Sequence, residues 1–194
     1  MPLTLDDVHD LIDSWVIDPD VATLGPATDL LATMSVGDPG RVDVLTVIAD
    51  HQALRGEVDA ALATLDEAAA DPGADADLIE ALRVSYLIEG GRGEQAEPLL
   101  QALRRRGSVL PEEALERVAD ALEASGRLRE AMRWFTIGLR ELDPQHDLPA
   151  PEEEFALIGR WRVRRALDLP PDHYDDLART TLDLRRDGAR ASWD

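Results

Sequence analysis

Residues 126–135 read GRLREAMRWF, and two earlier segments repeat the pattern at intervals of 35 residues: GRGEQAEPLL at 91–100 and GEVDAALATL at 56–65. Each segment opens with glycine, has alanine five residues later and a large apolar residue nine residues later. Glycine allows a helix to end in a tight turn, and alanine allows the next helix to approach its partner closely. The large residue fills the space between the helices. The shared register predicts three consecutive helix–turn–helix repeats.

The sequence around these turns has the spacing of helices and not of strands. Apolar residues before and after each glycine recur three or four positions apart, as on one face of a helix. Glycine and proline interrupt the pattern where helices would have to end, for example at residues 71–73 and 143–144. No stretch alternates apolar and polar residues between hairpin turns, so we expect almost no β-structure.

The repeats resemble tetratricopeptide (TPR) repeats, which are helix–turn–helix units of about 34 residues. Residues 111–144 match best, with Leu115, Val118, Ala119, Leu122, Gly126, Ala131, Phe135, Gly138 and Pro144 at the expected positions. Residues 41–72 match through Leu45, Ile48, Ala49, Gly56, Ala61, Leu65 and Ala68. The middle repeat departs from the pattern, because Pro98 stands where the second helix should already be established, and either delays or bends that helix.

We therefore predict an all-α protein, a right-handed α-solenoid of antiparallel helix hairpins forming a single domain over residues 1–194. The three TPR-like repeats occupy residues 41–144. Terminal repeats expose a face that needs cover, so we predict helical caps at both ends. The N-terminal cap spans 1–40, with helices at 5–17 and 29–34. The C-terminal helix pair spans 151–187, with helices at 152–167 and 172–186.

Composition removes many kinds of chemistry. The 194 residues include no cysteine, and all 20 basic residues are arginine, so thiolate, Cys-ligated zinc and lysine chemistry are excluded. The net charge of −20 repels nucleic acids and anionic membranes. The first residues do not resemble a secretory signal, and no apolar run could span a membrane, which predicts a cytoplasmic protein. The use of arginine and alanine suggests a bacterial source.

The candidate binding residues are acidic. The TPR resemblance implies that the first helix of each repeat lines a concave groove. When the positions of the TPR repeat are transferred to residues 41–72 and 111–144, the residues on that face are Asp43, Thr46, Asp50, Glu113, Glu116, Asp120 and Glu123. Such a groove would bind a basic peptide or partner protein, with salt-sensitive association. The alternative is that these carboxylates only solvate a helix face. Arg160, Arg162, Arg164 and Arg165 are equally ambiguous, since they could pair with Glu153 and other acids along their own helix.

Two classes of function stay open at this point. The first is a non-catalytic scaffold for protein–protein interaction. The second is a structural or regulatory subunit, possible as a homodimer, that self-associates through apolar capping helices near Trp161 and Trp193. An enzyme is the weakest option, since no catalytic, metal or cofactor motif is visible. The histidines, His9, His51, His146 and His173, are too far apart in sequence to share a helix face.

Overall fold

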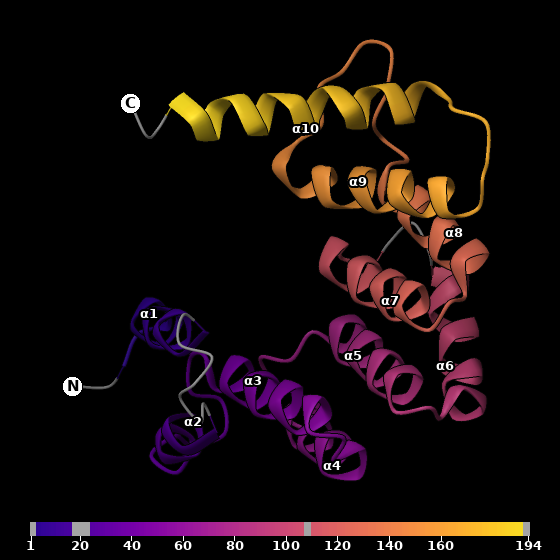
Figure 1. The fold of residues 1–194 in the computed structure, drawn as a ribbon. Helices are drawn as coiled ribbons and strands as arrows, with labels where there is room; N and C mark the ends of the chain where they lie inside the picture. The colour runs from indigo at the N-terminus through magenta and orange to yellow at the C-terminus, as the bar shows by residue number, and fades with distance from the viewer. Residues whose placement is uncertain (1–2, 17–23, 107–109, 192–194) are drawn as a thin grey trace. The chain divides into compact units, whose positions relative to one another are not determined.

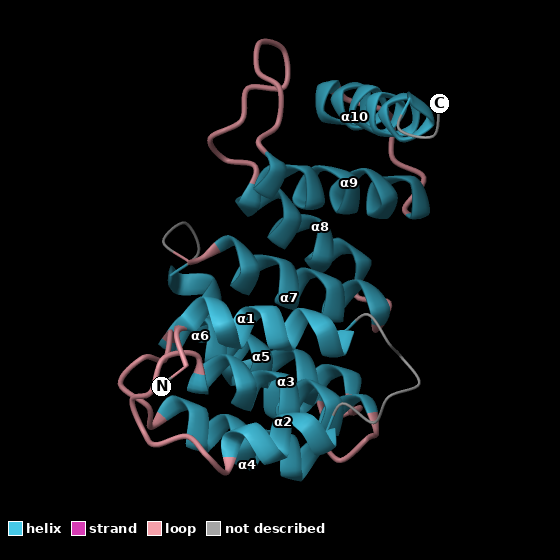
Figure 2. Cartoon of the chain, turned by 90° about the vertical axis from the view of Figure 1, so that its left-hand side faces the viewer, coloured by secondary structure: helices cyan, strands magenta, loops and turns pink. Residues whose placement is uncertain are grey.

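The computed structural model describes residues 3–16, 24–106 and 110–191, and within them it contains ten helices and no strand. Figure 2 shows these helices joined by loops. This confirms the predicted all-α class. In chain order the helices are α1 (Leu5–Val16), α2 (Leu24–Leu31), α3 (Arg41–Leu54), α4 (Val58–Ala69), α5 (Ala76–Glu89), α6 (Gly93–Arg106), α7 (Glu112–Ala124), α8 (Leu128–Gly138), α9 (Pro151–Ala166) and α10 (His173–Ala191).

The contacts between helices divide the chain into two units, residues 1–99 and residues 100–194. The division falls within α6, so the start of this helix belongs to the first unit and its end to the second. Each unit has its own helix packing, and the colour scale of Figure 1 separates the helices of residues 1–99 from those of residues 100–194.

The first unit is built on the hairpin of α3 and α4, and α5 packs against α4. Its main core joins these three helices through Leu45, Ala49, Ala61, Leu65, Ala68, Ile79, Leu82 and Tyr86. A second core lies between α3 and the two N-terminal helices, where Val8 of α1 and Ala27 of α2 meet Val44 and Ile48. The helices α1 and α2 therefore cover part of α3.

The second unit continues the pattern with α7 against α8, α8 against α9, and α9 against α10. Trp134 and Phe135 of α8 are among its largest fully buried side chains. Gly159 of α9 makes the close approach to α8 possible, because a Cβ atom at this position would lie 2.5 Å from the Phe135 ring. This packing brings α7, α8 and α9 together, and a narrow pocket lies where they meet.

The three register glycines have the same backbone conformation. The φ angles of Gly56, Gly91 and Gly126 are 77°, 74° and 79°, in the left-handed region that favours glycine. After each glycine, the next N–H donates to the carbonyl oxygen five residues earlier, at N···O distances of 2.9, 2.7 and 2.8 Å. This is the Schellman ending of an α-helix.

The alanine and the large residue of each segment are also equivalent in the structure. Ala61, Ala96 and Ala131 are completely buried, as are Leu65 and Leu100, and Phe135 is 1% exposed. The 35-residue register therefore corresponds to a true structural repeat, as the sequence predicted.

The helix ends differ from the predictions in several places. The second helix of the N-terminal cap lies at Leu24–Leu31 and not at 29–34, because Pro26 fits its first turn. The middle repeat's second helix starts at Gly93 and continues through Pro98, so this proline does not delay it. The last helix runs to Ala191, past the predicted end at 186. The predicted end of the first helix, Ile17, lies outside the described residues.

Candidate functional site

The acidic residues predicted for the second unit all lie on α7. This helix starts directly after Pro111, and Glu112 and Glu113 in its first turn favour the positive end of the helix dipole. Six of its positions are buried, namely Ala114, Leu115, Val118, Ala119, Ala121 and Leu122. The remaining positions, which include Glu113, Glu116, Asp120 and Glu123, face outward or lie at the edge of the packing.

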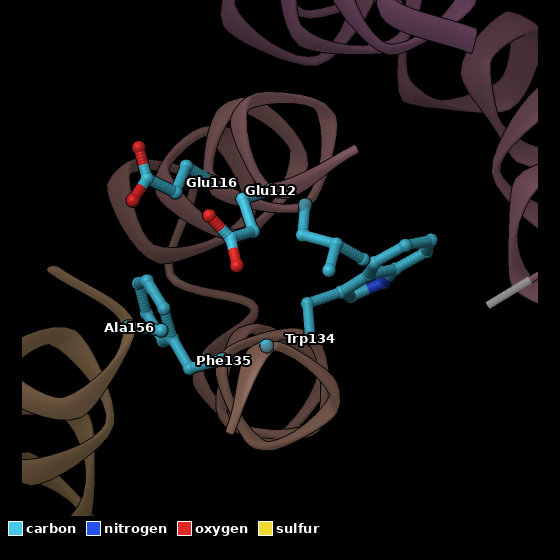
Figure 3. Close-up of a pocket in the computed structure, with 7 residues that line it drawn as sticks. Glu112, Glu116, Trp134, Phe135 and Ala156 are labelled. Atoms are coloured by element: carbon cyan, nitrogen blue, oxygen red, sulfur yellow. The ribbon is translucent and has the colours of Figure 1, made fainter. Parts of the chain in front are cut away.

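A narrow pocket lies where α7, α8 and α9 meet. Glu112 of α7 points toward it and Glu116 lies at its edge, while Phe135 of α8 and Ala156 of α9 form part of its apolar wall (Figure 3). Leu115, Trp134 and Gly138 complete the lining. The pocket therefore combines two carboxylates with an otherwise apolar surface.

The electrostatics of the α7 face are unfavourable for its carboxylates. Partial burial, followed by the nearby charges of Asp120, Glu112 and Glu113, raises the pKa of Glu116 to about 7. Burial also raises the pKa of Asp120, although Arg162 acts in the opposite direction. A cation bound at this face would reduce the repulsion among these carboxylates.

One cation of the chain already binds at the C-terminal end of this face. Arg162 of α9 donates from Nε and Nη2 to the two carboxylate oxygens of Glu123, both at 2.6 Å. Its Nη2 also lies 3.6 Å from Oδ1 of Asp120. The pairing with Glu123 is bidentate, the geometry in which arginine recognises a carboxylate best. It shows that this surface accepts a guanidinium group.

The sequence of this region also matches a known family. Residues 82–147 match the family model of the tetratricopeptide repeat. The matched segment contains the turns at Gly91 and Gly126, and this match over about a third of the chain supports a TPR-like repeat protein. TPR repeats generally mediate protein–protein interaction, and the family is typically non-catalytic. No curated protein and no solved structure matches the chain.

The other three predicted residues lie on α3 in the first unit, and each has a contact within that unit. His9 Nε2 lies 3.1 Å from Oδ2 of Asp43. Thr46 donates from Oγ1 to the carbonyl oxygen of Asp43, and Asp50 accepts from the Tyr86 hydroxyl at 2.8 Å. These three residues share α3, whereas the other four share α7, and the two sets belong to different units. Their role as a binding surface stays a prediction.

The arginines of α9 do not pair along their own helix as one reading of the sequence suggested. Arg160 donates to Asp172 at 2.7 and 3.1 Å, and Arg164 donates to Asp175 at 3.0 Å. Glu153 instead accepts from the backbone N–H of Ala150 and caps α9. The acids that pair with Arg160 and Arg164 come from the segment that leads into α10 and from its first turn, which a reading of helix spacing alone does not reveal.

The residues of the predicted self-association surface are only partly described. The guanidinium of Arg165 lies over the ring of Trp161, 4.8 Å from its centroid, so that an ion–aromatic contact covers part of this indole. Trp193 lies outside the described residues.

Within the described ranges, no three His, Asp or Glu side chains are positioned to share a metal ion. No helix in the same ranges combines the length and the apolar character needed to cross a bilayer.

Two residues of the α7 site were missed by the sequence analysis. Glu112 was read only as a charge at the start of a helix, although its four-residue spacing to Glu116 and Asp120 places all three on one helix face. Arg162 could not be assigned, because it lies 39 residues from Glu123 and only the packing of α9 brings them together.

Proposed function

We propose that this chain is a non-catalytic TPR-like interaction module that binds a basic peptide or a basic partner protein on the acidic face of α7. The observation that carries the proposal is the acidic face of α7, where Glu112, Glu116 and Asp120 recur every four residues and Arg162 already pairs with Glu123. The pocket beside Glu112 and Glu116 has a volume of only about 10 Å³, room for about one water molecule, so a ligand side chain would lie on this face and not inside the pocket. A lysine or arginine side chain has an apolar stem and a cationic end, which suits a face where carboxylates border apolar residues.

The contact of Arg162 supports a cationic ligand. It neutralises Glu123 at one end of the α7 face, whereas burial and then acidic neighbours keep the pKa of Glu116 raised at the other end. A ligand cation near Glu112 and Glu116 would reduce the repulsion among the α7 carboxylates, and this would favour its binding. The proposal includes a second surface on α3 of the first unit, formed by Asp43, Thr46 and Asp50, of which the two aspartates are acidic. A scaffold role in the bacterial cytoplasm is part of the same proposal and rests on composition.

The test uses a fluorescein-labelled peptide of alternating arginine and alanine, with fluorescence anisotropy as the measurement. The pocket variant Glu112→Gln/Glu116→Gln should bind it about tenfold more weakly than the original chain. The matched control is Glu141→Gln/Asp183→Asn, which replaces the same number of acidic side chains at exposed positions of the second unit. The control should change the affinity by less than about twofold.

Equal losses in both double variants would mean that only net charge matters, and the α7 site would be rejected. No binding to the original chain at low salt would reject a basic ligand altogether. Sedimentation of the chain alone tests the other function class: a dimer that persists at high salt would favour self-association through apolar caps over the proposed module.

A further inference from the structure

A second pocket of the C-terminal unit is lined by arginines. It lies where the end of α6 meets α8 and α9, and it has a volume of about 460 Å³. Four arginines line it: Arg104 from α6, Arg133 from α8, and Arg160 and Arg164 from α9. No carboxylate is among the lining residues that the structure describes. In a chain with a net charge of −20, this is an unusual local environment.

Three of these arginines already bind carboxylates of the same unit. Arg104 pairs with Glu130 at 3.2 Å, Arg160 with Asp172 at 2.7 Å, and Arg164 with Asp175 at 3.0 Å. Arg160 is 9% exposed in its side chain and also donates to the Thr136 hydroxyl, so packing holds its guanidinium in place. The pocket wall is therefore made of guanidinium groups that are already ordered, which lowers the entropy cost of binding an anion.

Arg133 differs from the other three. Its side chain is exposed, and the described part of the chain offers it no hydrogen-bond or ion-pair partner. Met132 and Ile137, both half-buried, lie on the same wall and give the pocket an apolar part. A ligand that satisfies this pocket needs a carboxylate for Arg133 and an apolar group for its neighbours.

The charge of the whole chain limits what this ligand can be. Nucleic acids and anionic membranes are repelled by the net charge of −20, and this repulsion grows with the number of charges they carry. A ligand with one or two carboxylates is repelled far less. The volume of the pocket suits one or two side chains and not a folded domain. We propose that this pocket binds a short acidic motif of a partner protein, in which Glu or Asp stands next to an apolar residue.

The test titrates the full chain with an end-blocked peptide, Glu-Leu-Glu-Leu-Glu, and follows the methionine methyl groups by NMR. The chain has three methionines, Met1, Met34 and Met132. Met132 lines the pocket, and Met34 lies in the first unit. The Met132 methyl signal should shift with peptide concentration, whereas the Met34 signal, from the first unit, should not. The peptide Gln-Leu-Gln-Leu-Gln, which lacks the carboxylates, should leave both signals unchanged.

The variant Arg133→Gln supplies the second measurement. It should weaken binding of the acidic peptide about fivefold, because it removes the unpaired guanidinium. Arg129→Gln is the matched control, since Arg129 is exposed on the same helix, carries the same charge and does not line the pocket. It should change the dissociation constant by less than about twofold.

Several results would overturn the proposal. One is a Met132 signal that stays fixed up to millimolar acidic peptide. Another is equal weakening by Arg133→Gln and Arg129→Gln, which would mean that the peptide senses only general charge. An equal shift of the Met132 signal with the glutamine peptide would mean that the pocket binds the apolar residues and does not recognise the carboxylates. The methyl spectrum also reports whether each variant is folded, so loss of structure cannot be mistaken for loss of binding.

Discussion

At the scale of single residues, Glu116 is the most perturbed group of the α7 face. Its pKa of about 7 results first from burial and then from its acidic neighbours. A folded-state pKa above the ordinary value of 4.5 means that the folded chain holds a proton that the unfolded chain releases. The stability that this group contributes is therefore complete below about pH 4.5 and is lost as the pH rises through about 7.

We predict that Glu116→Gln makes the chain less sensitive to pH in this window. The original chain should lose stability between pH 5 and pH 8, and the variant should lose less, because glutamine does not ionise. Urea denaturation at both pH values measures the difference. Glu141→Gln, which removes an exposed charge far along the sequence from this face, should leave the pH dependence unchanged. If the stability of the variant and that of the original chain changed equally with pH, the raised pKa of Glu116 would be contradicted.

At the scale of helices and turns, Gly126 allows the effect of backbone conformation on stability to be measured separately from steric crowding. A Cβ atom at Gly126 would meet no other atom within 4 Å, so the φ angle of 79° is what opposes a side chain there. We predict that Gly126→Ala destabilises the chain by about 1–2 kcal/mol, the usual cost of a left-handed conformation for other residues. Thermal or urea unfolding gives the measurement.

Gly93→Ala is the control for this substitution. Gly93 starts α6, has open space around it and does not have a positive φ. Alanine there should be neutral or stabilise the chain by up to about 1 kcal/mol. If both variants lost equal stability, the effect would not come from the turn conformation.

The beginning of α3 is anchored by a buried ion pair. Arg41 donates to Asp71 at 3.2 Å, and the side chains are 8% and 2% exposed. Burial alone would raise the pKa of Asp71, but the backbone N–H groups of Gly37 and Gly73 together with Arg41 hold it below its usual value. The pair connects the start of α3 to the turn after α4, and so closes the α3–α4 hairpin.

We predict that Arg41→Ala destabilises the chain by about 3–5 kcal/mol, because it leaves the Asp71 carboxylate buried without its countercharge. Chemical denaturation at neutral pH provides the measurement. Arg55→Ala, which breaks the exposed pair with Glu57, should cost less than about 1 kcal/mol. Similar costs for the two variants would show that the Arg41 pair is no stronger than a surface contact.

At the scale of the whole molecule, the dominant property is the net charge of −20. Repulsion among like charges opposes the compact state, and salt screens it over a Debye length of about 10 Å at 0.1 M. We predict that raising NaCl from about 20 to about 200 mM at pH 7.5 increases the melting temperature. Scanning calorimetry measures it.

The control is the same salt series near the isoelectric point, about pH 4.4. There the net charge is close to zero, so salt mainly screens attractive pairs such as that between Arg162 and Glu123. The melting temperature should then stay constant or fall. A rise of equal size at both pH values would show that salt acts by another route.

Much of the architecture could be predicted from local sequence. The turns at Gly56, Gly91 and Gly126 were recognisable because left-handed helix endings demand glycine, and this demand does not depend on distant residues. The buried alanines followed from the repeat register, whereas the acidic residues of α7 were assigned to one face through the TPR resemblance. The start of the second cap helix was missed, because Pro26 fits a first turn as well as a loop.

The sequence by itself determined the all-helical class, the repeat register and the excess of negative charge, since all three depend on neighbouring residues or on composition. Only the tertiary structure decided which charges meet. It placed Arg162 on Glu123, gathered four arginines around one pocket, and set Glu112 and Glu116 beside Phe135. These partners lie far apart in the chain, so their proximity depends on how whole helices pack.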